Sequence, residues 1–109
     1  MIKILIHGIN GKMGQEVLKQ LDFYDNCLLL SGFDKEITNK YNVPVYTNFN
    51  DIVEKPDVII DFSIPSATIS MLSYAKENHI PVVIATTGFS EEENKKILEY
   101  SKDLPIFKS

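Results

Sequence analysis

The sequence contains no tryptophan, a single cysteine and two histidines among its 109 residues. One cysteine cannot form a disulfide bond within the chain, and because Cys27 lies in an apolar run we expect a small buried side chain there. No apolar run approaches the roughly 20 residues that a membrane-spanning helix requires, and the first residues lack the charged start and cleavage site of a signal peptide. These absences favour a cytoplasmic protein.

Basic residues are also scarce. There are 11 lysines and arginines against 15 aspartates and glutamates, which gives a net charge of −4 and an isoelectric point near 5.1. Nucleic-acid-binding domains usually carry a basic face, so this balance argues against DNA or RNA as a partner. With 44% hydrophobic and 24% charged residues the composition is that of a globular protein, and the length allows one domain with one core.

Short apolar segments alternate with segments of helical periodicity along the chain. The segment 43–46 is a weak strand, because Pro44 restricts it to a sheet edge or a loop. A capping box formed by Ser90 and Glu93 predicts the start of the last helix. The predicted strands are Ile2–His7, Cys27–Phe33, 43–46, 57–62, 81–85 and 105–108, and the predicted helices are Lys12–Leu21, 66–78 and 91–102.

This order of elements predicts an α/β fold in which parallel strands are joined by right-handed crossovers, with helices on both faces of the sheet. A doubly wound, Rossmann-like sheet fits the pattern. Such sheets bind ligands at the carboxyl ends of their strands. The segments to examine for a binding site are therefore 7–14, 33–35, 62–65 and 85–88.

Three glycines follow the first predicted strand with the spacing G-x-x-G-x-x-G. Gly8 permits a sharp turn, Gly11 lets the backbone approach a pyrophosphate, and Gly14 lets the helix pack closely on the sheet. The positive end of the helix would then face the phosphates. Asn10 would tolerate a positive φ in this loop, and Lys12 is a cation suited to phosphate or ribose. Alone, the motif also fits an ordinary glycine-rich turn.

An acidic residue, Asp34, ends the second predicted strand, 20 residues after Gly14. A carboxylate at this distance is positioned to accept hydrogen bonds from an adenosine ribose. Lys35 follows directly and would offset the repulsion between Asp34 and the 2′-phosphate of NADPH, so the pair is compatible with both coenzymes. The alternative is a turn residue followed by a solvated lysine.

Two further strand ends carry polar and aromatic residues, F-S-I-P at 62–65 and A-T-T-G-F at 85–89. In a doubly wound sheet both face the crevice near the nicotinamide. Thr86 and Thr87 are suited to the ribose hydroxyls or the carboxamide, and Phe62 or Phe89 to packing on a ring. Each segment is also explained as a turn that caps the next helix.

Groups for chemistry on a substrate are missing from the pattern. His7 lies beside Gly8 at a strand end and His79 near a helix end, and neither has a serine, cysteine or carboxylate partner at motif spacing. Asp57 and Asp61 bracket one strand and are interpreted as structural. No cluster of metal ligands is evident. The residues therefore predict a cofactor platform that holds no metal and handles no substrate.

Four segments together resemble the N-terminal domain of 4-hydroxy-tetrahydrodipicolinate reductase, also called dihydrodipicolinate reductase. They read I-x-G-x-x-G-K-M-G at 6–14, D-K at 34–35, D-V-I-I-D-F-S-x-P at 57–65 and A-T-T-G-F at 85–89. The last two occurring together are far more specific than the glycines alone. The resemblance covers essentially the whole chain.

This resemblance implies an NADH- or NADPH-dependent oxidoreductase that reduces the cyclic dicarboxylate 4-hydroxy-tetrahydrodipicolinate to tetrahydrodipicolinate in the diaminopimelate route of lysine biosynthesis. Residues 1–109 would be its dinucleotide-binding domain. The family's second domain, which binds substrate and forms the homotetramer, is absent from this chain, so no catalytic residue is assigned here.

The resemblance also implies a role for each cofactor-binding residue. Gly8 through Met13 would cradle the pyrophosphate, Asp34 would bind the adenosine ribose, and Lys35 would meet a 2′-phosphate. Phe62 and Ser63 would lie near the nicotinamide, and 85–87 would contact its ribose and carboxamide. The implied cofactor-binding residues are Gly8, Ile9, Asn10, Gly11, Lys12, Met13, Asp34, Lys35, Phe62, Ser63, Ala85, Thr86 and Thr87.

Two residues depart from the family pattern: Asn10 and Ala85 stand where many members carry glycine. Both changes affect how closely the backbone can approach a cofactor. The resemblance further suggests a cofactor contact for Ser109. Two other interpretations stay open, a stand-alone NAD(P)-binding regulatory or redox-sensing module without its own catalysis, and the cofactor domain of another dehydrogenase.

Overall fold

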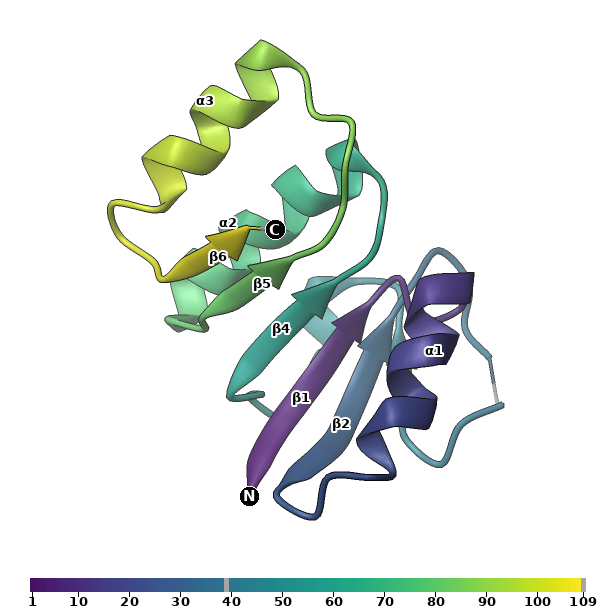
Figure 1. Ribbon diagram of the computed structural model, residues 1–109. Helices are drawn as coiled ribbons and strands as arrows, with labels where there is room; N and C mark the ends of the chain where they lie inside the picture. The colour runs from purple at the N-terminus through teal and green to yellow at the C-terminus, as the bar shows by residue number, and fades with distance from the viewer. Residues whose placement is uncertain (39, 109) are drawn as a thin grey trace.

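A computed structural model describes residues 1–38 and 40–108. It contains one six-stranded sheet in the order β3-β2-β1-β4-β5-β6, in which every neighbouring pair of strands is parallel (Figure 1). The strands are β1 (Ile2–His7), β2 (Cys27–Phe33), β3 (Val45–Tyr46), β4 (Val58–Asp61), β5 (Val82–Ile84) and β6 (Ile106–Lys108). The helices are α1 (Lys12–Leu21), α2 (Pro65–Asn78) and α3 (Glu91–Tyr100), with a short 3-10 turn η1 (Phe49–Asp51). This is the predicted doubly wound, Rossmann-like sheet.

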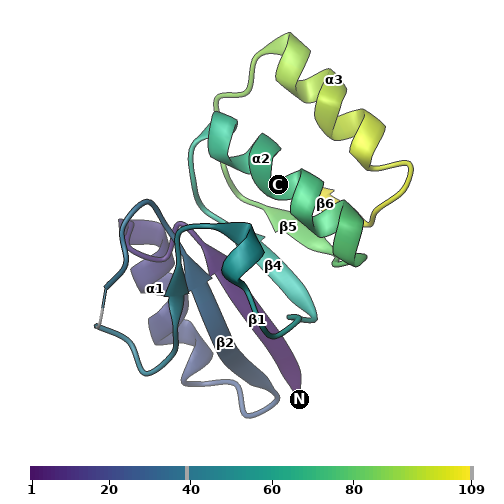
Figure 2. The ribbon, with the colours of Figure 1, turned by 180° about the vertical axis from the view of Figure 1, so that it is seen from behind.

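The central strand β1 is apolar on both faces, and each face has its own layer of helix. Ile4 and Ile6 point toward α1 and pack with Ile9 and Val45 in one hydrophobic cluster. Leu5 points the other way, into a larger cluster with residues of β4, β5, α2 and α3. Figures 1 and 2 show α1 on one side of the sheet and α2 and α3 on the other. The continuous apolar run of β1 follows from this double burial.

The bounds of β1, α1 and β2 agree with the prediction, and the other elements differ from it by a few residues. β3 is only two residues long and lies at the edge of the sheet, directly after Pro44, as the proline requires. The capping box of Ser90 and Glu93 is formed, with both of its hydrogen bonds present. The helix that it starts ends at Tyr100, two residues before the expected end.

Two expectations about single residues are wrong. Cys27 is half-buried rather than buried, because it begins β2 at the rim of the sheet. Asn10 does not have a positive φ: among the non-glycine residues that the structure describes, only His79, the C-cap of α2, does. Within the described ranges no helix is long and apolar enough to span a membrane.

Candidate functional site

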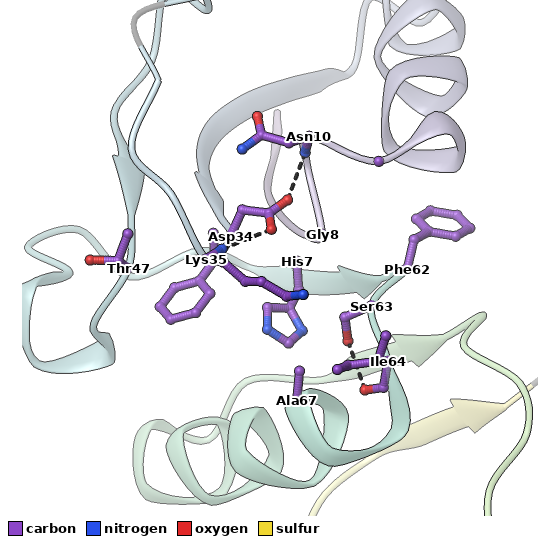
Figure 3. A pocket seen from close by; sticks show the side chains of 12 residues that line it. His7, Gly8, Asn10, Asp34, Lys35, Thr47, Phe62, Ser63, Ile64 and Ala67 are labelled. Atoms are coloured by element: carbon purple, nitrogen blue, oxygen red, sulfur yellow. Dashed lines mark hydrogen bonds between the residues drawn. The ribbon is translucent and has the colours of Figure 1, made fainter.

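A pocket of about 540 Å³ opens at the carboxyl ends of β1, β2 and β4 (Figure 3). One wall comes from the glycine loop, a second from the segment after β2, and a third from the segment that joins β4 to α2. This is the edge of a doubly wound sheet at which ligands bind. The lining residues are His7, Gly8, Asn10, Gly11, Phe33, Asp34, Lys35, Thr47, Phe62, Ser63, Ile64 and Ala67.

The three glycines of the loop are needed for different reasons. Gly8 has φ +89°, and a Cβ atom there would lie 2.3 Å from the carbonyl oxygen of Phe62. A Cβ atom on Gly14 would lie 2.6 Å from the carbonyl oxygen of Gly8. Packing within the chain therefore explains these two. A Cβ atom on Gly11 would meet only the oxygen of Gly8, at 3.4 Å, so packing gives little reason for a glycine at this pocket-lining position.

The amino end of α1 lies directly after Gly11 and is uncapped. No side chain accepts a hydrogen bond there, and the first turn contains no acidic residue. Within residues 1–38 and 40–108, the backbone N–H groups of Lys12 and Met13 make no hydrogen bond. Free N–H groups and the positive end of the helix dipole suit an anion such as a phosphate. The loop therefore fits a diphosphate group.

Asp34 directly follows β2 and holds the glycine loop from across the pocket. One carboxylate oxygen accepts the backbone N–H of Asn10 at 2.8 Å, and the other accepts the N–H of Lys35 at 2.8 Å (Figure 3). The side chain is half-buried and lines the pocket. Each oxygen keeps a further lone pair, so the carboxylate can accept hydrogen bonds from a ligand as well.

Not every residue of the predicted site lines this pocket. Ile9 is fully buried, and its side chain packs against Gly32 in the core. Lys12 and Met13 are exposed at the start of α1 and contribute no pocket surface. The predicted residues that the pocket brings together are Gly8, Asn10, Gly11, Asp34, Lys35, Phe62 and Ser63.

The segment after β5 lies beside the pocket rather than in its wall. Thr86 is buried, donates its hydroxyl to Asp61 at 2.9 Å and accepts the backbone N–H of Ser63 at 2.9 Å. Ala85 is half-buried and Thr87 is exposed, and neither lines the pocket. Phe89 packs against the larger hydrophobic cluster. Ser109 lies outside the described residues.

His7 and Asp61 form a buried pair at the floor of the pocket, which none of the sequence motifs predicted. His7 Nδ1 lies 2.7 Å from an oxygen of Asp61. The two residues are 54 positions apart in the chain but face each other in the register of β1 and β4. The available signal was an aspartate at the end of an apolar strand, next to a strand that ends in histidine.

The carboxylate of Asp61 is fully buried yet well supplied with donors. Besides His7 it accepts the hydroxyl groups of Ser63, Thr68 and Thr86. Burial raises the pKa of Asp61, but the hydrogen bonds from His7, Ser63 and Thr68 lower it, so that the pKa lies below its ordinary value. Asp61 is therefore ionised at neutral pH. No group of residues in the described ranges could hold a metal ion.

The family described as "Dihydrodipicolinate reductase, N-terminus" matches residues 2–109. The chain belongs to this family. Among curated relatives, the 4-hydroxy-tetrahydrodipicolinate reductase of Caldanaerobacter subterraneus is 45% identical and that of Clostridium novyi 38% identical, each over 109 residues. Both alignments cover all of this chain and 43% of the relative, so the chain spans less than half the length of these reductases.

Solved structures agree with the assignment to the dihydrodipicolinate reductase family. The dipicolinate-bound dihydrodipicolinate reductase of Paenisporosarcina sp. TG-14 has a TM-score of 0.77 and 28% identity, covering 93% of this chain and 43% of that one. Homoserine dehydrogenase from S. aureus also has a TM-score of 0.77, with 15% identity over 99% of this chain and 32% of that one, a likeness of fold alone. The resemblance predicted from the four motifs is confirmed.

Proposed function

We propose that this chain is the coenzyme-binding part of a 4-hydroxy-tetrahydrodipicolinate reductase. The whole protein would use NADH or NADPH to reduce that cyclic dicarboxylate to tetrahydrodipicolinate in lysine biosynthesis, in the cytoplasm and as a homotetramer. The observation that carries the proposal is the position of Gly11. Packing within the chain gives little reason for a glycine there, and the residue lies between the free N–H groups of α1 and the carboxylate of Asp34. Family membership supplies the reaction.

The pocket suits the adenosine and diphosphate half of the coenzyme. The backbone from Gly8 to Met13 would hold the diphosphate, Asp34 would accept the hydroxyls of the adenosine ribose, and Lys35 would meet a 2′-phosphate. Phe62 and Ser63 line this same pocket, so we assign them to its wall together with Asp34. The coenzyme, when bound, would supply a hydride to the substrate.

The segment 85–87 would serve the nicotinamide half, one strand farther along the sheet. Because the hydroxyl of Thr86 is already engaged with Asp61, contacts from this segment would come from its backbone and from the exposed Thr87. The role that we propose for the chain is to bind and orient the coenzyme.

Two measurements test the proposal. NADH and NADPH are titrated against this chain by calorimetry, and the protein encoded by the complete gene is assayed with 4-hydroxy-tetrahydrodipicolinate. Binding together with reductase activity is the expected result. Coenzyme binding without activity in that protein would favour a regulatory or redox-sensing module instead, and no binding at all would remove the coenzyme site.

Asp34→Ala is expected to weaken NADH binding by about 1–3 kcal/mol, or about 5- to 150-fold in Kd, because the ribose hydroxyls lose their charged acceptor. Asp34 also accepts two backbone N–H groups, and Asp34→Asn keeps one acceptor oxygen for them. The NADH affinity of Asp34→Asn should therefore lie between those of the natural chain and Asp34→Ala. Calorimetric titration measures each Kd, with Asp25→Ala as an exposed control. Unchanged NADH affinity in Asp34→Ala would remove this residue from the site.

Lys35→Ala is expected to weaken NADPH binding alone. Its ammonium group is assigned to the 2′-phosphate, which NADH lacks, and a charge-assisted hydrogen bond contributes about 1.5–3 kcal/mol. The ratio of the two dissociation constants, measured for the variant and for Lys95→Ala as an exposed control, checks this. An equal loss for both coenzymes would contradict the assigned role.

A further inference from the structure

His7 is a buried residue that nevertheless reaches the pocket. Only 3% of its surface is exposed, and its ring packs against Phe33 and Phe49, with centroids 5.2 and 5.9 Å away. It also lines the pocket, where Figure 3 shows the imidazole between the Asp34 and Ala67 sides of the wall. A polar ring packed against two aromatic side chains is costly to bury unless both of its nitrogens find partners.

Asp61 determines which nitrogen of His7 carries the proton. An ionised carboxylate only accepts hydrogen bonds, so the 2.7 Å contact requires a proton on His7 Nδ1. The other donors to Asp61 are hydroxyl groups, which turn to suit it, so the pair is stable in this arrangement. In the neutral ring Nε2 then holds a lone pair and acts as an acceptor.

Nε2 of His7 is left without a partner in the chain. Within residues 1–38 and 40–108 it makes no hydrogen bond, although Nδ1 does. Among the described residues, one fully buried polar side-chain atom lacks a partner, the hydroxyl oxygen of Ser31. Nε2 of His7, which also lacks a partner, is therefore not fully buried. The acceptor therefore reaches the pocket space, next to the residues assigned to the adenosine ribose.

We propose that His7 is a specificity residue of the coenzyme pocket, whose Nε2 accepts a hydrogen bond from the adenosine half of the coenzyme, either from the base amino group or from a ribose hydroxyl. Asp61 is the positioning residue that keeps Nδ1 protonated and Nε2 free. The proposal rests on the proposed function, because it needs the adenosine half to occupy this pocket. A ligand without a donor at this place would leave a buried acceptor unpaired.

The first test compares ligands and variants by calorimetry. His7→Phe keeps a ring of similar size and removes both nitrogens, and it should bind NADH and AMP about tenfold more weakly than the natural chain does. Inosine monophosphate, which carries a carbonyl in place of the amino group, separates the two donors. If inosine monophosphate binds the natural chain about tenfold more weakly than AMP, and His7→Phe removes that difference, the base amino group is the donor. If the ratio of the two dissociation constants is the same for the natural chain and for His7→Phe, the donor is a ribose hydroxyl.

A second measurement needs no variant, in case His7→Phe does not fold. The ¹⁵N resonances of the two histidines are followed by NMR during titration with AMP. We expect His7 to show a protonated Nδ1 and an unprotonated Nε2, and the Nε2 resonance to move on binding, while exposed His79 stays unchanged. A proton on Nε2, or an unmoved Nε2 resonance at saturating AMP, would overturn the proposal.

The outcomes separate the two claims. If the natural chain binds neither NADH nor AMP, the proposed function fails, and the role of His7 fails with it. If it binds both, but His7→Phe binds them equally well or the His7 resonance does not respond, only the role of His7 is refuted. Binding of NADH without AMP would refute the assignment of this pocket to adenosine.

Discussion

Gly8→Ala is expected to lower the free energy of unfolding by more than about 3 kcal/mol, which is enough to unfold much of a domain of marginal stability. The backbone at Gly8 has φ +89°, where an alanine is strained. In addition, the new Cβ atom would lie 2.3 Å from the carbonyl oxygen of Phe62, which belongs to the backbone and cannot turn aside. Urea and thermal unfolding followed by circular dichroism measure the loss.

Gly11→Ala is the matched control, in the same loop and with the same added methyl group. Gly11 has φ −77°, which any residue adopts, and its Cβ atom would meet one oxygen at 3.4 Å. We therefore expect stability to change by less than about 1 kcal/mol. NADH affinity should nevertheless fall at least about tenfold, because the methyl group takes the place of the diphosphate. A folded Gly11→Ala chain with unchanged NADH affinity would refute the close approach of the diphosphate at Gly11.

Much of this fold was predictable because its signals are local. β1 and β2 are apolar runs, α1 has a repeating apolar face, and each is bounded by residues that end it. The 3-10 turn η1 was not predicted, because it depends on the side chain of Asn48 and on the stacking of Phe49 against Phe33 from β2. The periodicity of the sequence does not predict a contact of this kind between residues that are far apart in the chain.

The candidate site was predictable to the extent that its residues follow strand ends. Gly11 and Asp34 lie in one pocket because β1 and β2 are neighbours and end at the same edge. Thr86 was expected to offer its hydroxyl to the ribose or carboxamide of the nicotinamide half, but it follows β5, the neighbour of β4, and its hydroxyl is bonded to Asp61. The pair of His7 and Asp61 required the register of β1 and β4, which the sequence alone does not specify.

Asp61→Ala is expected to destabilise the chain by about 2–6 kcal/mol, because each of two buried donors left without an acceptor costs about 1–3 kcal/mol. The change leaves the Nδ1–H of His7 and the hydroxyl of Thr86 without their acceptor in a buried space. Asp57→Ala is the control, since that carboxylate is exposed and accepts a single N–H, from Lys3. A loss from Asp61→Ala no larger than that from Asp57→Ala would contradict the buried network.

The same network predicts how stability depends on pH. The pKa of Asp61 is lower in the folded chain than the ordinary value of 3.8, so the folded state binds its proton less readily than the unfolded state does. The resulting stabilisation is complete above pH 3.8 and is lost as the pH falls through the lowered pKa of the folded state. Urea unfolding between neutral and acidic pH should therefore show a steeper fall below that value for the natural chain than for Asp61→Ala. Because removing Asp61 deletes this part of the pH dependence, parallel curves for the two chains would mean that the carboxylate gains no net stabilisation from His7 and the hydroxyl groups.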